Sequence, residues 1–136
     1  MDEKELKERT KQFALHIMSL VDKLPNTIAG RALGNQLVRS GTSVGANYRA
    51  ACRGRSKAEF VSKIGVVAEE ADESVYWLEL IMDGKLLGRD FVEPLLKEAN
   101  ELAAIFIASM KTAGQSQIKN HQSKIKNVRF RNQIKN

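Results

Sequence analysis

Four arginines that share one face of a predicted helix are the residues whose type and spacing first suggest chemistry. Arg31, Arg39, Arg49 and Arg53 fall within an arc of about 80° when they are placed at ~100° per residue, as in an α-helix. The guanidinium group presents N–H donors in a fork that matches the oxygens of a phosphate. This basic ridge fits a surface that contacts nucleic-acid phosphates, and it fits equally well an ordinary solvated face.

The basic ridge belongs to a longer segment with an excess of positive charge. Residues 31–63 contain seven Lys or Arg residues and one acid, Glu59, so the segment has a net charge of +6. Either RNA or DNA would fit, because phosphate contacts supply affinity but little base readout. The predicted nucleic-acid-binding residues are Arg31, Arg39, Arg49, Arg53, Arg55, Lys57 and Lys63.

The next predicted helix carries the opposite charge. Residues 69–83 contain six acids and no Lys or Arg, a net charge of −6. These acids can pair with the basic ridge inside one bundle, or with the ridge of a neighbouring subunit placed head to tail. Four of them could in principle gather Mg²⁺ for nuclease chemistry, but carboxylates on consecutive turns of one helix more often form a solvated face. The four are Glu69, Glu70, Asp72 and Glu73.

A seam of glycines runs along the same helix as the basic ridge. Gly30, Gly34, Gly41 and Gly45 lie within about 60° of one another on the helical wheel. Each interior glycine costs ~1 kcal/mol relative to alanine, so four on one face are expected only where something packs closely.

Trp77 lies outside the predicted core stripe of the third helix. It shares a flanking stripe with Glu70 and Glu73, and a polar stripe with one aromatic anchor is typical of a contact between subunits. The alternative is a Trp that partly covers the side of the bundle. The predicted oligomer interface comprises Gly41, Gly45, Glu70, Glu73 and Trp77.

Motifs for catalysis and for cofactors are not found. Neither His16 nor His121 has a Glu three residues before it, which excludes a di-iron site of the carboxylate-bridged type. Zinc-ligand spacing is missing, and the segment from Gly41 to Gly45 is not followed by the Gly-Lys-Ser/Thr of a phosphate-binding loop. We therefore expect a protein that is not an enzyme and that needs no cofactor or metal.

Four amphipathic helices are predicted to position these residues. They cover about residues 2–23, 27–52, 56–83 and 93–110, with Thr27 and Ser56 as candidate N-terminal caps. Short links join consecutive helices, which favours an all-α, antiparallel up-and-down four-helix bundle.

The net charge of +6 for the whole chain of 136 residues comes from its C-terminal end. Residues 1–114 carry 16 basic and 16 acidic residues, whereas residues 115–136 carry six basic residues and no acid. The second segment is rich in Gln, Asn, Ser and Lys, with too few apolar residues to repay ordering. We predict a bundle over residues 1–114 and a flexible, disordered basic tail over residues 115–136, with a phosphate-gripping arm as the functional alternative.

The compartment predicted from the sequence is the cytoplasm. The longest apolar stretch, 102–110, is about half of the ~20 residues that span a bilayer, and the N-terminus does not resemble a secretory signal. A single cysteine, Cys52, suits a reducing environment. No contact with a membrane is expected.

Three segments resemble a known family. They are the runs RSGTSVGANYRA from Arg39, RSKAEFVSKIG from Arg55 and EADESVYWLELI from Glu70. With the first and fourth helices, the resemblance covers roughly residues 9–112. The sequence is similar to small bacterial four-helix-bundle proteins first noted in intervening sequences of 23S rRNA genes. Two departures are Glu69, where the family more often has Lys, and the tail, which has no counterpart there.

The resemblance implies an assembly and a class of partner. It implies an up-and-down bundle that forms a ring, typically a homopentamer. The family also resembles the accessory variability protein of diversity-generating retroelements, a basic pentameric barrel that binds nucleic acid and a reverse transcriptase. The positions that would carry nucleic-acid binding are Arg39, Arg49, Arg53, Arg55, Lys57 and Lys63.

Two functions are therefore expected from the sequence. The first is a non-enzymatic, ring-forming, homopentameric bundle that binds RNA or DNA through the basic ridge, as an accessory factor to a nucleic-acid enzyme such as a reverse transcriptase. The alternative is an oligomeric scaffold that binds a protein partner and has no direct role with nucleic acid.

Overall fold

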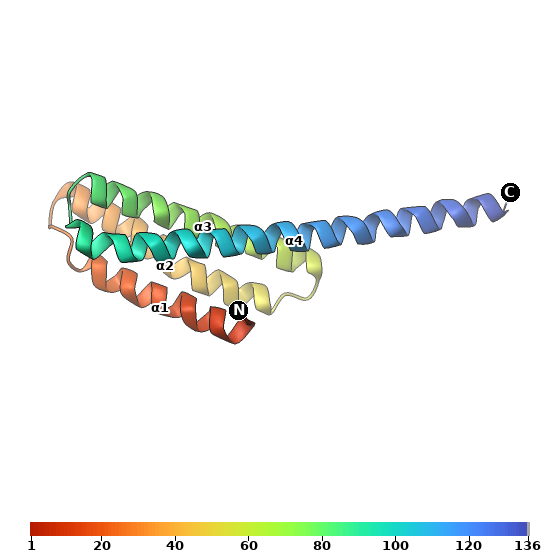
Figure 1. Ribbon diagram of the computed structural model, residues 1–136, viewed down its shortest axis with the longest axis horizontal. Coiled ribbons are helices and arrows are strands. Elements are labelled where there is room, and N and C mark those ends of the chain that lie inside the picture. Colours follow the sequence, from red (N-terminus) through yellow and green to blue (C-terminus); the bar gives the residue numbers. More distant parts are fainter. Residues whose placement is uncertain (136) are drawn as a thin grey trace.

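Four helices run alternately up and down in the computed structural model of the chain (Figure 1). They are α1 (Glu3–Val21), α2 (Ile28–Cys52), α3 (Lys57–Asp83) and α4 (Arg89–Lys135). The structure describes the backbone of residues 1–135 and the side chains of residues 1–114. The prediction of an all-α, antiparallel four-helix bundle is confirmed. The predicted tail, residues 115–136, falls outside the described side chains, so its flexibility stays a prediction.

Side-chain caps fix where the first three helices begin. The Asp2 carboxylate accepts the backbone N–H of Glu5 at 2.8 Å, and the Thr27 hydroxyl accepts that of Gly30 at 3.0 Å. The Ser56 hydroxyl accepts the backbone N–H of Glu59 at 3.1 Å, as the sequence predicted. Each cap satisfies a donor that has no partner within its own helix.

The fourth helix begins earlier than predicted. It starts at Arg89 rather than Glu93, so Pro94 lies inside the helix instead of in its first turn. Because a proline has no N–H, the helix lacks the backbone hydrogen bond that residue 94 would have donated to the carbonyl oxygen of residue 90. Val92, in the added turn, is fully buried, and this burial favours the earlier start.

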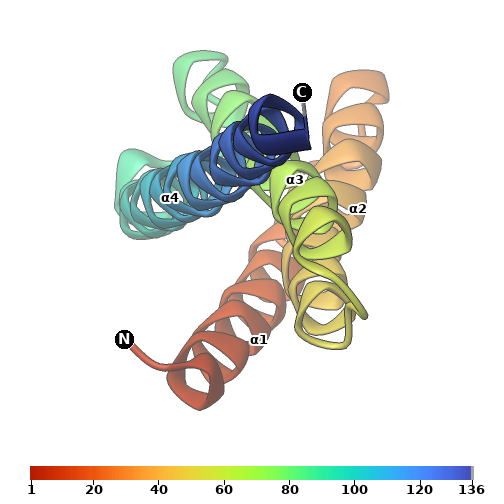
Figure 2. The ribbon, with the colours of Figure 1, turned by 90° about the vertical axis from the view of Figure 1, so that its right-hand side faces the viewer.

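The core is built from one apolar stripe on each helix. Seen along the bundle, α3 lies between α2 and α4, while α1 packs mainly on α2 and touches α4 less (Figure 2). Phe13 and Phe106 are the largest of the fully buried side chains, and the ring of Tyr48 lies 5.4 Å from that of Phe106. Other fully buried residues are Ile17, Leu37, Val44, Ile64, Val67, Leu78, Ile81, Val92 and Leu102.

The glycine seam of α2 faces α1 of the same chain. A Cβ atom on Gly41 would lie 2.9 Å from both Cγ1 and Cγ2 of Ile17, and one on Gly45 would lie 3.1 Å from Oγ1 of Thr10. Both glycines are buried. The close packing expected from the seam is therefore present. The structure places Gly41 and Gly45 in the contact between α1 and α2 of one chain. Their predicted role at an interface between chains is not tested.

Within the described residues, no helix combines the length and the apolar character needed to cross a membrane. Cys52 is a free, partly buried cysteine near the end of α2. Burial raises the pKa of its thiol, and the same cause raises the pKa of the neighbouring Tyr48 phenol.

Candidate nucleic-acid interface

All seven predicted nucleic-acid-binding residues are exposed, but they do not form one continuous surface. Helix α2 packs against α1 on one side and against α3 on the other, and the basic ridge spans the outer face between them. Cations at the two edges of the ridge therefore meet different neighbours. Whether a cation is paired with an acid therefore depends on its position along and across α2.

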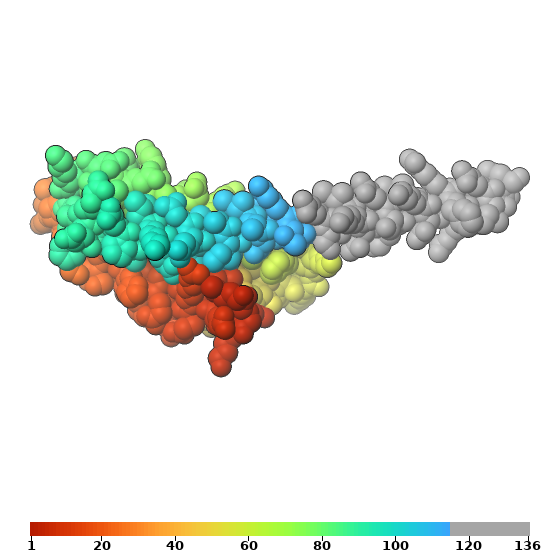
Figure 3. All heavy atoms as spheres, in the orientation of Figure 1, coloured from red at the N-terminus to blue at the C-terminus, as the bar shows by residue number. Residues whose placement is uncertain are grey.

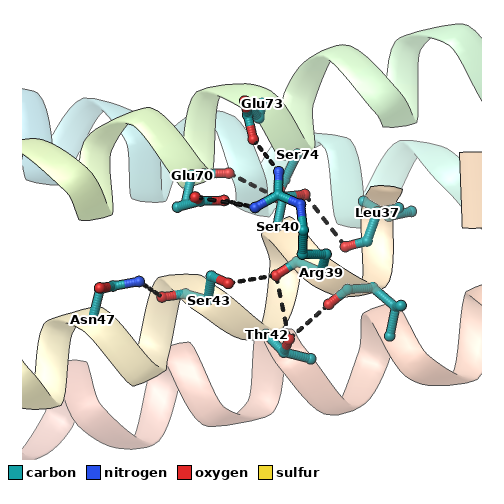
Figure 4. Close-up of polar contacts among 10 residues, drawn as sticks. Leu37, Arg39, Ser40, Thr42, Ser43, Asn47, Glu70, Glu73 and Ser74 are labelled. Atoms are coloured by element: carbon teal, nitrogen blue, oxygen red, sulfur yellow. Dashed lines mark hydrogen bonds and ion pairs between the residues drawn. The ribbon is translucent and has the colours of Figure 1, made fainter. Parts of the chain in front are cut away.

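Arg39 is neutralised inside the chain by the acidic helix. Its Nη1 atom lies 3.2 Å from Oε2 of Glu70, and its Nη2 atom lies 2.5 Å from Oε2 of Glu73 (Figure 4). Hydrogen bonds to Glu73 and then to Glu70 raise the pKa of the Arg39 guanidinium. Of the two pairings open from the sequence, the internal one holds for these residues. A role of Glu70 and Glu73 in a subunit contact stays a prediction.

A buried pair of serines sets the register between the two helices. The hydroxyl oxygens of Ser40 and Ser74 are 2.9 Å apart, and both residues are fully buried between α2 and α3 (Figure 4). Ser74 also donates to the backbone carbonyl of Glu70 at 2.9 Å. Because buried hydroxyls need partners, this contact favours the alignment that brings Arg39 opposite the acids.

Arg31 lies at the far end of α2 from the other cations. Its Nη1 atom donates to the side-chain carbonyl of Asn26 at 2.8 Å. With a rise of ~1.5 Å per residue, the 22 residues between Arg31 and Arg53 correspond to about 33 Å along the helix. Arg31 is thus well separated from Arg53 along the ridge, and its predicted contact with nucleic acid is not tested.

Four cations remain exposed at one end of the bundle, and we call them the basic end. They are Arg49, Arg53, Arg55 and Lys63. Among the side chains of residues 1–114, none of the four has an ion-pair partner. Their segment, the end of α2 and the start of α3, lies at the surface at the end of the bundle that holds the N-terminus (Figure 3). The basic end is therefore a cluster of exposed positive charge.

Three members of the basic end line a single hollow at the turn between α2 and α3. The hollow has a volume of about 620 Å³, and it is lined by Arg53, Arg55 and Lys63. Arg49 lines the neighbouring groove, between α1 and α2. Lys57 lines a third groove, between α3 and α4, and so lies apart from the hollow.

Small residues contribute to the lining of the hollow. They are Ala50, Gly54 and Ala58, and Ser62 adds a hydroxyl group. Glu59 also lines it, but its Oε2 atom accepts the backbone N–H of Arg55 at 2.7 Å. The carboxylate is thus engaged in holding the turn rather than in pairing with a cation.

The exposed face of α3 presents acids around an aromatic residue that the sequence analysis did not single out. Tyr76 is 54% exposed, and its ring lies 5.2 Å from that of Trp77. Trp77 itself is only partly exposed and packs against the core, with its Nε1 atom buried and unpaired among the described residues. This position agrees with the alternative in which Trp77 covers the side of the bundle. Its predicted role between subunits is not tested.

The acids on this face do not form a metal site. Across the described residues, no group of three or more His, Cys, Asp or Glu side chains is arranged to hold a metal ion. Four acids of α3 are exposed and have no ion-pair partner within residues 1–114. They are Glu69, Asp72, Glu79 and Asp83.

Comparison with known proteins supports the fold and identifies the family. No curated protein matches the chain. The crystal structure of a protein with unknown function from the S23 ribosomal protein family of Bacteroides thetaiotaomicron is similar, with 33% sequence identity and a TM-score of 0.72. That match covers 77% of this chain and 97% of the other. The family described as 23S rRNA-intervening sequence protein matches residues 2–108, and the chain belongs to this family.

Proposed function

We propose that this protein is a non-enzymatic bundle that binds RNA or DNA through the basic end. The observation that carries the proposal is the set of four exposed cations, Arg49, Arg53, Arg55 and Lys63, without acidic partners among the described side chains. Arg39 contributes little, because Glu70 and Glu73 already neutralise it. The binding surface is thus smaller than the predicted ridge and lies at one end of the molecule.

Affinity at such a surface comes from phosphate contacts and from the release of counterions. Each neutralised phosphate contributes a slope of about −0.7 to −0.9 to the dependence of log K on log salt concentration. Four contacts therefore predict a slope of about −3 to −4. Because the contacts are made to phosphates, we expect little preference among base sequences.

The test is a titration of labelled RNA and DNA oligonucleotides with the full chain, followed by fluorescence anisotropy at several salt concentrations. Replacing Arg49 and Arg53 by Glu should weaken binding to all sequences alike. The matched control replaces Arg31 and Lys97 by Glu, which changes the net charge equally at exposed positions away from the basic end. A chain that ends at Gly114 separates the contribution of the tail.

Two results would count against nucleic-acid binding. The first is that neither the full chain nor the shortened chain binds better than a neutral control protein at low salt. The second is that the control variant loses as much affinity as the variant of the basic end. In the second case only net charge would matter, and the basic end would not be a defined surface.

We further propose that the chain assembles into a homopentameric ring and acts as an accessory factor to a nucleic-acid enzyme such as a reverse transcriptase. The family resemblance supports this assembly. Apolar side chains left exposed on the single chain also support it, including Leu15, Met18 and Phe91. Light scattering of the full chain measures the mass directly. A monomer at micromolar concentration would contradict the ring.

A protein-binding scaffold is the second candidate function. Exposed Tyr76 among unpaired acids on α3 favours it, since aromatic residues are enriched at protein interfaces. If the chain is such a scaffold, the basic end serves only self-assembly. Charge reversal there should then dissociate the oligomer. An intact oligomer that has lost nucleic-acid binding would count against the scaffold.

A further inference from the structure

We propose that the hollow between α2 and α3 binds the terminal phosphate of a nucleic-acid strand. The proposal rests on the proposed function and names the part of the ligand that the hollow receives. A terminal phosphate is a monoester with three acceptor oxygens, whereas every phosphate within the strand is a diester. The hollow distinguishes the two through its shape and its charge.

The shape of the hollow suits a compact anionic group. Ala50, Gly54 and Ala58 contribute only small groups to its lining, and its volume of about 620 Å³ accommodates a phosphate with its hydration shell. The cations Arg53 and Lys63 reach it from the end of α2 and the second turn of α3. An anion in the hollow is therefore approached from two helices rather than from one exposed edge.

The charge of the lining matches a phosphomonoester. Arg53, Arg55 and Lys63 together with Glu59 give the hollow a net charge of +2. A phosphomonoester carries about −1.5 to −2 at pH 7, which neutralises this charge, whereas a diester carries −1 and leaves half of it unpaired. Charge-assisted hydrogen bonds to Arg and Lys are stronger than those between neutral groups.

The donors of the hollow are available to a ligand. Within residues 1–114, neither the three cations nor the hydroxyl of Ser62 has a side-chain partner, and the Glu59 carboxylate is held by the backbone N–H of Arg55 at 2.7 Å. The Glu59 carboxylate therefore stays beside the turn between α2 and α3. No rearrangement of the bundle is needed before an anion enters.

Arg49 extends the site along the strand. It precedes Arg53 by four residues, which is about 6 Å along α2 and close to the spacing of neighbouring phosphates on an extended strand. It lines the adjoining groove, where the next phosphate of the strand would lie; the groove carries four cations and three acids, a net charge of +1. This arrangement favours the end of a strand over a free phosphate ion, because a free ion would use the hollow alone.

The test compares three oligonucleotides of one sequence, with a 5′-phosphate, with a 3′-phosphate, or with hydroxyl groups at both ends. We expect the full chain to bind at least one phosphorylated form about tenfold more tightly than the hydroxyl form, and inorganic phosphate only weakly. Replacing Lys63 or Arg53 by Gln should reduce this preference to below about threefold. The matched control, Arg31→Gln, should leave the preference unchanged, because Arg31 lies at the other end of the same helix.

The failure of this inference differs from the failure of the proposed function. If all three oligonucleotides bind equally, the strand-end site is wrong and nucleic-acid binding stands. If none of them binds, both are wrong. If inorganic phosphate competes as well as the phosphorylated strand, the hollow is a site for free phosphate and the inference is overturned.

A change of pH gives an independent readout. The charged groups that line the hollow are Arg53, Arg55, Lys63 and Glu59, and no histidine is among them. Between pH 7.5 and pH 5.5 the phosphomonoester gains a proton, since its second pKa is about 6, while the diesters keep their charge. The preference for the phosphorylated strand should therefore shrink at pH 5.5. A preference that stays constant over this range contradicts recognition of the dianion.

Discussion

Replacing Gly41 by Ala should destabilise the bundle, although the same change in an ordinary helix interior stabilises it. The added methyl group would lie 2.9 Å from Cγ1 and Cγ2 of Ile17, closer than carbon atoms approach without strain. These atoms are branched directly from Cβ, so the side chain has little freedom to move away. Overpacking of this kind costs about 1–3 kcal/mol, whereas the gain in helix propensity is about 1 kcal/mol. We expect a net loss of up to about 2 kcal/mol in the free energy of unfolding.

Gly65→Ala is the matched control in the neighbouring helix. A Cβ atom at Gly65 would lie 3.5 Å from Sδ of Met110, which is an ordinary contact. This variant should be stabilised by up to about 1 kcal/mol. Urea denaturation with an unchanged slope measures both effects on the same scale.

A double variant isolates the contact responsible. In an Ile17→Ala background the obstructing atoms are gone, so Gly41→Ala should become stabilising by about 1 kcal/mol. The coupling energy between the two positions is then about 1–3 kcal/mol, the cost of the overpacking itself. If Gly41→Ala stabilises the otherwise unchanged chain as much as Gly65→Ala does, the close packing of α1 on the glycine seam is wrong.

Three further predictions address other contacts. Arg9→Ala should lower the free energy of unfolding by about 1–2 kcal/mol in urea denaturation, because this partly buried arginine joins α1 to two glutamates of α4. Arg39→Gln should change nucleic-acid affinity less than Arg53→Gln does in an anisotropy titration, because only Arg39 is already paired. The raised pKa values of Cys52 and Tyr48 mean that the folded state holds these protons more tightly than the unfolded state. The contribution of these two groups to stability should therefore be constant from neutral pH to about pH 8.5 and fall as the pH rises above it, which denaturation at several pH values above 7 measures.

The helices could be predicted from the sequence because their signals are local. Apolar spacing and the caps at Thr27 and Ser56 act within a few residues, and both caps are present in the structure. The start of α4 was predicted too late, because Pro94 is a strong local signal for a first turn. Burial of Val92, a tertiary effect, outweighs it.

The candidate site was predicted only in outline, because helical spacing does not tell which neighbouring helix packs on which side of α2. Arg39 and Arg49 share the arc of the ridge, yet the first meets acids of α3 and the second faces the groove toward α1. The pair of Arg9 with Glu98, 89 residues apart, has no sequence signal at all. The hollow likewise depends on small residues that come together only when the turn closes.

The order of packing in the bundle has a consequence for how it forms. Each helix packs mainly on the next one in the chain, α1 on α2, α2 on α3 and α3 on α4, and only the smaller contact between α1 and α4 joins the two ends of the bundle. Topologies rich in such local contacts fold within microseconds to milliseconds, since little loop-closure entropy is lost before contacts form. Formation of the Arg9 contact across α1 and α4 closes the longest loop, so we expect it to come last in folding and to open first in unfolding.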